Sequence, residues 1–291
     1  MVHLFLPLFA AIIYTIASLF FKQGYLRGAT AAQTFHVSNM IGGLIFLPLW
    51  IFGGHIPFAD LWHPALVAGL ILFAGFTMFL SIRFGDISLV TPLMGTKVIF
   101  VALAQVIITG EALSTGLWIA SLLTMFGILL IGYKDLKNSR AGLAGILLAI
   151  LSSLSFGVSD VFMQQWAPLY GKVAFLGAVA GIVGLFSVVK LSMSRLGVMN
   201  FVPGAFRPVA LASIILAGQG MMMGYALGFF HDAARVNVVY GSRGLWSLVL
   251  VFLIGRFFGN DERHSSGGAF LWRVAGTILI TTAIVIAFMG K

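Results

Sequence analysis

Two cationic residues stand inside long apolar stretches of this sequence, where a charge needs a reason. Lys97 lies within 87–109 and Arg243 within 234–254. A charge near the middle of a membrane span costs several kcal/mol unless it faces water or a partner. Arg offers a forked donor set to a carboxylate or phosphate and Lys a point charge, so the two together could hold an anionic group. The structural alternative is that one or both pair with Asp160 or with helix carbonyls.

Asp160 is the one carboxylate well inside an apolar stretch. Ser153, Gly157, Asp160 and Gln164 follow helical spacing, so they share one face, which we expect to point into a helix bundle. As a functional group, Asp160 could titrate in proton coupling or hold a substrate amine. As a structural group, it would neutralise one of the two cations. Both interpretations stay open, and its expected role is coupling or charge balance.

Aromatic and polar side chains accompany the cations at helical spacing. Tyr240 precedes Arg243 by three residues and Trp246 follows it by three, which places a stacking wall for a planar substrate near the guanidinium. The alternative is a lipid-facing position for Trp246, packing for His36 and interhelical hydrogen bonding for the buried amide of Gln105. The residues expected to contact substrate are Lys97, Arg243, Tyr240, Trp246, Tyr14, Ser18, His36, Asn39 and Gln105.

The composition indicates what kind of element holds these residues. Of 291 residues, 60% are hydrophobic and 9% are charged, against about 25% charged in soluble domains. Lipid can solvate so much apolar surface, and spans of about 20 apolar residues are expected. The sequence predicts an all-α integral membrane protein with spans at 2–21, 30–52, 62–82, 87–109, 115–133, 141–163, 172–191, 207–230, 234–254 and 269–289.

Several function classes are disfavoured by what the sequence lacks. It contains no Cys, hence no disulfide or thiol nucleophile, and no Walker loop, Gly-x-Ser-x-Gly or His-Glu-x-x-His motif. We therefore expect no enzyme activity, no catalytic residue, no metal and no cofactor. The net charge of +9 is spread singly between apolar runs, so we expect no nucleic-acid partner.

The two halves of the chain align weakly but in order. Gly-Thr-Lys at 95–97 matches Gly-Ser-Arg at 241–243, and the same register places Thr91 against Asn237. Five spans per copy is an odd number, so the second copy enters the membrane from the opposite side. This predicts an inverted repeat, typical of secondary transporters with a site near the midplane. The predicted repeats are 1–137 and 138–291.

Loop charges predict the orientation. Most of the 17 Lys and Arg residues follow odd-numbered spans. The positive-inside rule then places the loop between the halves in the cytoplasm and both termini outside. We expect the protein in a bacterial inner membrane.

Three stretches resemble the ten-helix EamA-type permeases of the drug/metabolite transporter superfamily. They are Gly-Asp-Ile-Ser-Leu-Val at 85–90, Gly-Glu-Ala-Leu at 110–113 and Gly-Ile-Leu-Leu-Ile-Gly at 127–132. The resemblance implies a metabolite exporter or exchanger with a central cavity between its halves. It also implies termini on the cytoplasmic side, opposite to the orientation that the loop charges predict.

The sequence thus predicts a secondary transporter that moves a small polar metabolite, carrying a carboxylate or phosphate, by alternating access. An amino-acid or a cationic, drug-like solute exported with proton coupling is the first alternative. A membrane scaffold or receptor without transport is the second. The expected partners are a small-molecule substrate and the lipid bilayer; a monomer would suffice, and a homodimer is an open alternative.

Overall fold

The computed structural model describes residues 2–84, 92–138, 142–193, 200–254 and 267–289. The stretch at 85–90 and Thr91 lie outside these residues. The described chain is helical throughout and contains no strand, which confirms the all-α class. In it, seven helices are long and apolar enough to cross a membrane, and the shorter apolar helices 94–109 and 115–131 add to them.

The helices correspond in order to the ten expected spans. Eight spans are single helices: α1 (Phe5–Leu26), α2 (Ala31–Phe52), α3 (Trp62–Phe84), α6 (Thr115–Ile131), α8 (Leu143–Trp166), α9 (Lys172–Met193), α10 (Phe206–Phe230) and α13 (Gly267–Met289). Two are split, into η3 (Met94–Thr96) with α5 (Lys97–Thr109) and into α11 (Ala233–Tyr240) with α12 (Arg243–Ile254). The short elements at the ends of the bundle are η1 (Val2–Leu4), η2 (Phe58–Asp60), α7 (Tyr133–Asn138) and η4 (Ala167–Tyr170).

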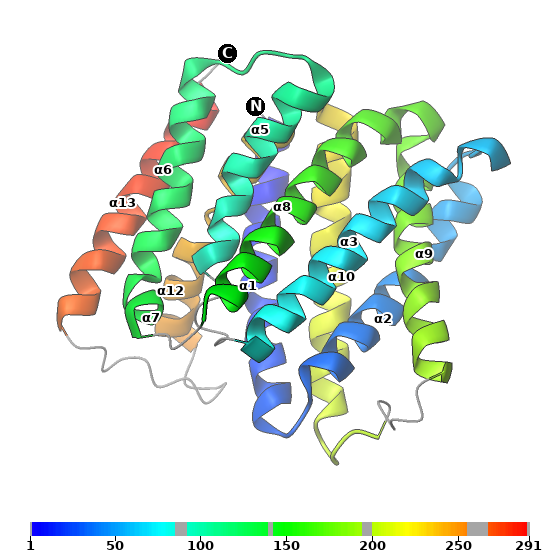
Figure 1. Cartoon of the computed structure of the whole chain (residues 1–291), viewed down its shortest axis with the longest axis horizontal. Helices are drawn as coiled ribbons and strands as arrows, with labels where there is room; N and C mark the ends of the chain where they lie inside the picture. The colour runs from blue at the N-terminus through cyan, green and yellow to red at the C-terminus, as the bar shows by residue number, and fades with distance from the viewer. Residues whose placement is uncertain (1, 85–91, 139–141, 194–199, 255–266, 290–291) are drawn as a thin grey trace.

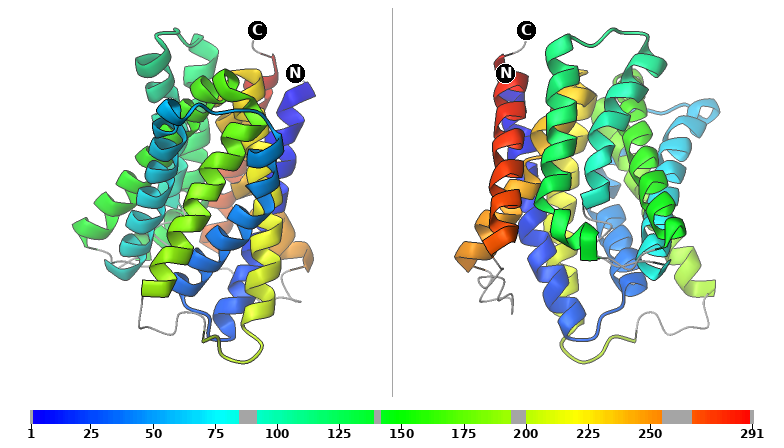
Figure 2. Two further views of the ribbon diagram at one scale, coloured as in Figure 1. Left: turned by 90° about the vertical axis from the view of Figure 1, so that its right-hand side faces the viewer. Right: turned by 60° about the vertical axis from the view of Figure 1, so that its left-hand side comes forward.

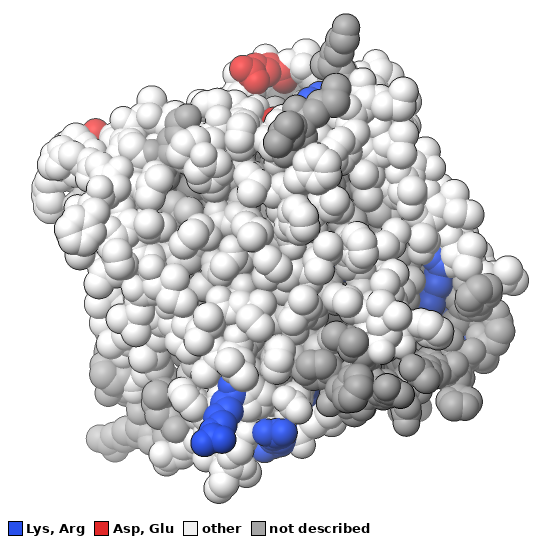
Figure 3. Space-filling model, turned by 180° about the vertical axis from the view of Figure 1, so that it is seen from behind, with Lys and Arg blue, Asp and Glu red and all other residues white. Residues whose placement is uncertain are grey.

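The long helices run side by side as one bundle, with the two chain ends at the same end (Figures 1 and 2). Seen from behind, Asp and Glu show at that end, whereas most of the visible Lys and Arg lie toward the opposite end (Figure 3). The chain therefore has a basic end, opposite its termini.

Helix pairing relates the two halves of the chain. The main contacts join α2 to α9, α6 to α13, α1 to α10 and α3 to α8. If the first five spans are exchanged with the last five, this set of pairs maps onto itself. Such a pattern is expected when two halves are related by a repeat, and it interleaves the halves into one membrane unit. The division at 137/138 stays a prediction.

Small residues allow close approaches between paired helices. A Cβ atom on Gly43 of α2 would lie 2.9 Å from the Cα of Gly184 on α9. In a membrane, where no hydrophobic effect draws helices together, such backbone contact is a main source of packing energy. The α2–α9 pair is therefore held by its small residues.

The two spans that carry the cations change from α-helical to 3-10 hydrogen bonding at matching positions, although the sequence predicted continuous helices there. The first passes through the 3-10 turn η3 just before Lys97. The second does so before Arg243, where Gly241 and Ser242 donate backbone hydrogen bonds to carbonyls three residues back, at 3.1 and 3.0 Å. Both turns pack against α6, which leaves no room for a side chain at either glycine. Tight turns inside helices often mark hinges.

Candidate functional site

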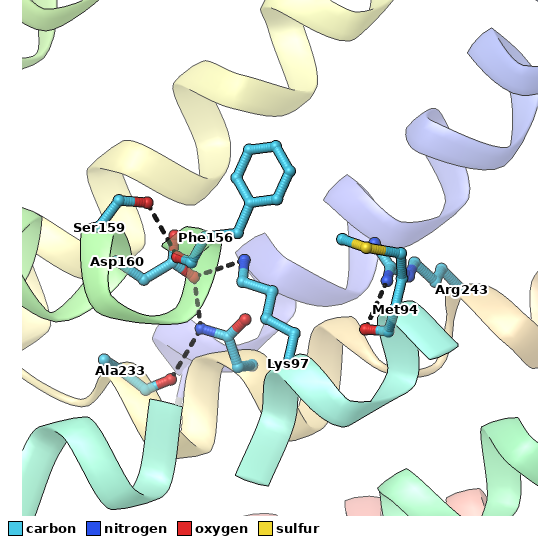
Figure 4. A network of polar contacts seen from close by, with 8 residues as sticks. Met94, Lys97, Phe156, Ser159, Asp160, Ala233 and Arg243 are labelled. Carbon is cyan, nitrogen blue, oxygen red and sulfur yellow. Dashed lines mark hydrogen bonds and ion pairs between the residues drawn. The ribbon is translucent and has the colours of Figure 1, made fainter. Parts of the chain in front are cut away.

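Lys97 and Asp160 form an ion pair inside the bundle (Figure 4). Lys97 Nζ lies 2.7 Å from Asp160 Oδ2, and the side chains are 12% and 15% exposed. Lys97 begins α5 and Asp160 lies on α8, so the pair joins the two halves. Asp160 therefore balances the charge of Lys97, and the substrate role of Lys97 stays a prediction.

Asn237 completes the environment of this carboxylate. Its Nδ2 donates to Asp160 Oδ2 at 2.8 Å and to the Ala233 carbonyl oxygen at 3.1 Å. Asn237 is 1% exposed and belongs to α11. Asp160 thus connects α5, α8 and α11. Sequence reasoning aligned Asn237 with Thr91 but gave it no role, because nothing in the repeat identifies the acceptor of its amide.

Arg243 stands at the first position of α12, between two aromatic rings. Its Cζ lies 5.3 Å from the centre of the Tyr14 ring and 5.1 Å from that of Tyr240. The two rings meet edge to face at 6.1 Å. Cation–π contact of this kind favours a guanidinium in a site with little water. Tyr14 and Tyr240 therefore both contact the Arg243 guanidinium, and the stacking wall for a planar substrate stays a prediction.

The polar contacts of Arg243 leave much of its capacity open. Nη2 donates to the Met94 carbonyl oxygen at 3.5 Å, a long hydrogen bond (Figure 4), and the Tyr240 side chain also interacts with the guanidinium. No ion pair to a carboxylate is found for Arg243 within the described residues. A guanidinium carries five N–H donors. Donors therefore remain for an anionic ligand.

The contact with Met94 brings the two cations into one neighbourhood. Met94 lies in η3, one turn before Lys97, and Figure 4 shows both cationic side chains around it. Two cations and one carboxylate meet there, which leaves one uncompensated positive charge among the described residues. Buried charges are normally paired. This imbalance is the main chemical feature of the site.

Two buried polar atoms on residues within three positions of Arg243 along the chain have no hydrogen-bond partner in the described structure: the Ser242 hydroxyl and Trp246 Nε1. Ser242 is 1% exposed, and Trp246 packs against the same apolar cluster as Tyr14 and Tyr240. Buried donors without partners call for an explanation, and an absent ligand is one. Sequence reasoning selected Trp246 but missed Ser242, although it is the middle residue of the repeated tripeptide.

Gln105 and Gln164 use their amide oxygens at the start of α11. Gln105 Oε1 accepts from the Ala234 backbone N–H at 2.9 Å, and Gln164 Oε1 accepts from that of Ala233 at 2.7 Å. These contacts satisfy two of the free N–H groups at the helix start. Asp232, which precedes the helix, makes no such cap. The substrate role of Gln105 stays a prediction beside this packing role.

Three more of the selected residues lie within or between other helices. The Ser18 hydroxyl donates to the Tyr14 carbonyl inside α1, at 2.9 Å. Asn39 Nδ2 donates to the Ser187 hydroxyl at 3.1 Å, between α2 and α9. His36 lines a cavity formed by α2, α3 and α9, not the neighbourhood of Arg243. Their substrate roles also stay predictions.

A small charged cluster ties the first residues to α11. Asp232 lies 3.1 Å from Arg235 Nη1 and 3.9 Å from His3 Nε2. Burial raises the pKa of Asp232, partly offset by Arg235. Burial also lowers the pKa of His3 below its usual range. The described residues contain no group of three His, Cys, Asp or Glu side chains that could hold a metal.

Comparisons with known proteins agree with the fold. A model of the EamA-like transporter family matches residues 1–133, which confirms the resemblance stated above. Of the solved structures, 28 chains match. One crystal structure is 14% identical, with a TM-score of 0.74, and covers 99% of this chain and 98% of its own; it shows a shared fold alone. No curated protein matches the chain.

Proposed function

We propose that the chain is a membrane transporter of the EamA type, because a model of the EamA-like transporter family matches its residues 1–133. We propose that it moves a small polar metabolite by alternating access and binds it through a carboxylate or phosphate at Arg243. Charge balance carries this proposal: of the two buried cations, Lys97 has a carboxylate partner and Arg243 has none among the described residues.

The surroundings of Arg243 support an anionic ligand. Charge-assisted hydrogen bonds from a guanidinium are stronger than neutral ones, and a planar fork suits carboxylates and phosphates. The unpartnered Ser242 hydroxyl and Trp246 N–H, on residues within three positions of Arg243 along the chain, are two further candidate donors. Tyr14 and Tyr240 restrict the guanidinium, so less conformational entropy is lost on binding.

Lys97 can supply a second cation to the same site when its ion pair with Asp160 opens. An incoming anion competes with Asp160 for the ammonium, and Asp160 then keeps the hydrogen bond from Asn237. Opening this ion pair removes a contact between α5 and α8. The tight turns before Lys97 and Arg243 are placed to serve as the hinges of such a change.

The charge arrangement argues against a simple cation as substrate. A cation would require Asp160, whose Oδ2 already contacts both Lys97 and Asn237. A zwitterion remains compatible, because its carboxylate would bind Arg243 as proposed. We place the protein in a bacterial inner membrane, with its basic end in the cytoplasm and its termini outside, by the positive-inside rule.

Ligand-induced stabilisation tests the proposal. The purified protein is heated with phosphate, phosphate esters, mono- and dicarboxylates, amino acids and amines in turn. A ligand that binds only the folded state raises the temperature midpoint of unfolding. At a ligand concentration of 100 times the dissociation constant, it adds about 2.7 kcal/mol to the free energy of unfolding. We expect one class of anions to stabilise the protein. Proteoliposomes that contain the protein should exchange that anion across their membrane.

Arg243→Gln should lose this stabilisation and the exchange, whereas Arg207→Gln provides the matched control. Arg207 is exposed and lies at the start of α10, away from the site. Stabilisation of the wild type by amines alone, or anion binding that survives unchanged in Arg243→Gln, would overturn the proposal.

A further inference from the structure

A cavity of about 350 Å³ lies between α2, α3 and α9. Its walls are largely phenylalanine: Phe35 comes from α2, Phe73, Phe76 and Phe79 from α3, and Phe186 from α9. Phe73, Phe76 and Phe186 are 45%, 56% and 45% exposed, so the cavity opens on the outer surface of the bundle. On a membrane protein such an apolar outer surface faces lipid tails. We call this cavity the α2–α3–α9 groove.

One end of the groove is polar. Lys190 and His36 are its two ionisable lining residues. Lys190 lies in the last turn of α9 and His36 in the second turn of α2, so both lie toward the basic end. Lys190 is exposed and has no carboxylate partner among the described residues. The groove is therefore amphipathic, with a cation at its rim and aromatic rings inside.

His36 adds a second, independent sign of an occupant. Its Nδ1 is buried and has no hydrogen-bond partner in the described structure. Lys190 is close enough to act on it electrostatically. His36 and Lys190 thus both line the same opening. An anionic or acceptor group between them would satisfy both.

The length of the groove fits one leaflet of a bilayer. Along α3, Phe73 lies eleven residues before the end of the helix at Phe84, about 17 Å at 1.5 Å per residue. Half of a hydrocarbon core is about 15 Å thick. Lys190 lies three residues before the end of α9, at the depth where headgroups and glycerol esters begin. A lipid chain entering beside Lys190 would reach the aromatic rings without crossing the midplane.

We propose that the α2–α3–α9 groove binds one acyl chain of an anionic phospholipid, with the headgroup phosphate at Lys190. In its Nδ1–H tautomer, His36 donates to an ester oxygen of the same lipid. Basic positions between membrane helices are known to select anionic headgroups by this combination of charge and depth. The site shares no residue with the Arg243 site and stands independently of the substrate.

Native mass spectrometry of the delipidated protein tests this. The protein is titrated with phosphatidylglycerol and, separately, with phosphatidylcholine of the same chains. We expect the wild type to bind phosphatidylglycerol more tightly than phosphatidylcholine. Lys190→Ala should weaken the binding of phosphatidylglycerol about fivefold, because one interfacial cation contributes about that much affinity. Phosphatidylcholine carries the same phosphate but offsets its charge with choline, so its binding should weaken less, and the preference for phosphatidylglycerol should shrink in Lys190→Ala. Lys190→Gln replaces the alanine variant if the latter does not fold.

Two further variants locate the site. Arg207→Ala removes an exposed cation that does not line the groove, and should change phosphatidylglycerol binding less than twofold. Ala32→Phe places a ring in the groove from α2 and should weaken the binding of both lipids. Equal losses in Lys190→Ala and Arg207→Ala would overturn the proposal. So would unchanged binding in Ala32→Phe, or displacement of the lipid by glycerol phosphate alone, which would indicate a water-soluble anion.

Discussion

Replacing Asp160 by leucine leaves the Lys97 ammonium in the bundle without its counter-charge. In the native protein this carboxylate accepts from Lys97 at 2.7 Å and from Asn237 at 2.8 Å. The paired side chains are only 12% and 15% exposed, so little water can replace the lost partner. Removing one member of a buried pair costs about 3–5 kcal/mol. We expect a loss of that size in the free energy of unfolding for Asp160→Leu.

The double variant Lys97→Met/Asp160→Leu should recover most of this loss. Apolar residues of similar volume remove the desolvation cost of both charges together, so the exchange is often close to neutral. Asn237 loses one acceptor but keeps the Ala233 carbonyl oxygen, a cost of about 1 kcal/mol. The double variant should therefore unfold within about 1–2 kcal/mol of the wild type.

Unfolding by sodium dodecyl sulfate in mixed micelles, followed by circular dichroism, measures these differences. Glu111→Leu serves as the control, since Glu111 is exposed and forms no ion pair with the described residues; its effect should stay within about 0.5 kcal/mol. A loss below about 1 kcal/mol in Asp160→Leu would refute the reasoning from a buried pair. A double variant as unstable as the sum of the single ones would refute it too.

Three other changes test the packing and the charged cluster. Gly241→Val should cost about 1–3 kcal/mol by overpacking against Thr124, and Thr124→Ser should recover part of it in the same unfolding titration. Gly43→Leu should destabilise by at least as much, whereas Gly42→Leu, where a side chain meets nothing within 4 Å, should not. Burial holds the pKa of His3 below its usual 6.5, so the unfolded chain takes up the proton first, and stability falls as the pH drops below about 6.5. Thermal unfolding from pH 7.5 to 5 should show a smaller decline for His3→Gln; an equal decline would contradict this assignment.

The order and class of the helices followed from the sequence because the length of an apolar run determines whether it can span a bilayer. The cost of charge in lipid likewise singled out Lys97, Asp160 and Arg243. Which cation Asp160 neutralises could not be predicted. That choice depends on how α8 is rotated against α5 and α11, and the rotation is set by packing rather than by spacing.

Other features left no pattern in the sequence that could be recognised. Gln105 and Gln164 bond to backbone N–H groups, and a backbone partner leaves no trace in residue types. The tight turns before Lys97 and Arg243 arise where glycines pack against α6, a contact between segments distant along the chain. The repeated glycine before each cation was visible, but its effect on the helix was not.

The selectivity of the site for negative charge is best measured directly. Isothermal titration compares the anion identified in the ligand screen with its uncharged amide or ester analogue, in the wild type and in Arg243→Gln. A charge-assisted contact is worth about 1.5–3 kcal/mol, so the wild type should bind the anion at least about tenfold more tightly. Arg243→Gln should lose nearly all of this preference. A preference for the anion that is the same in both proteins would contradict the assignment of Arg243 as its binding residue.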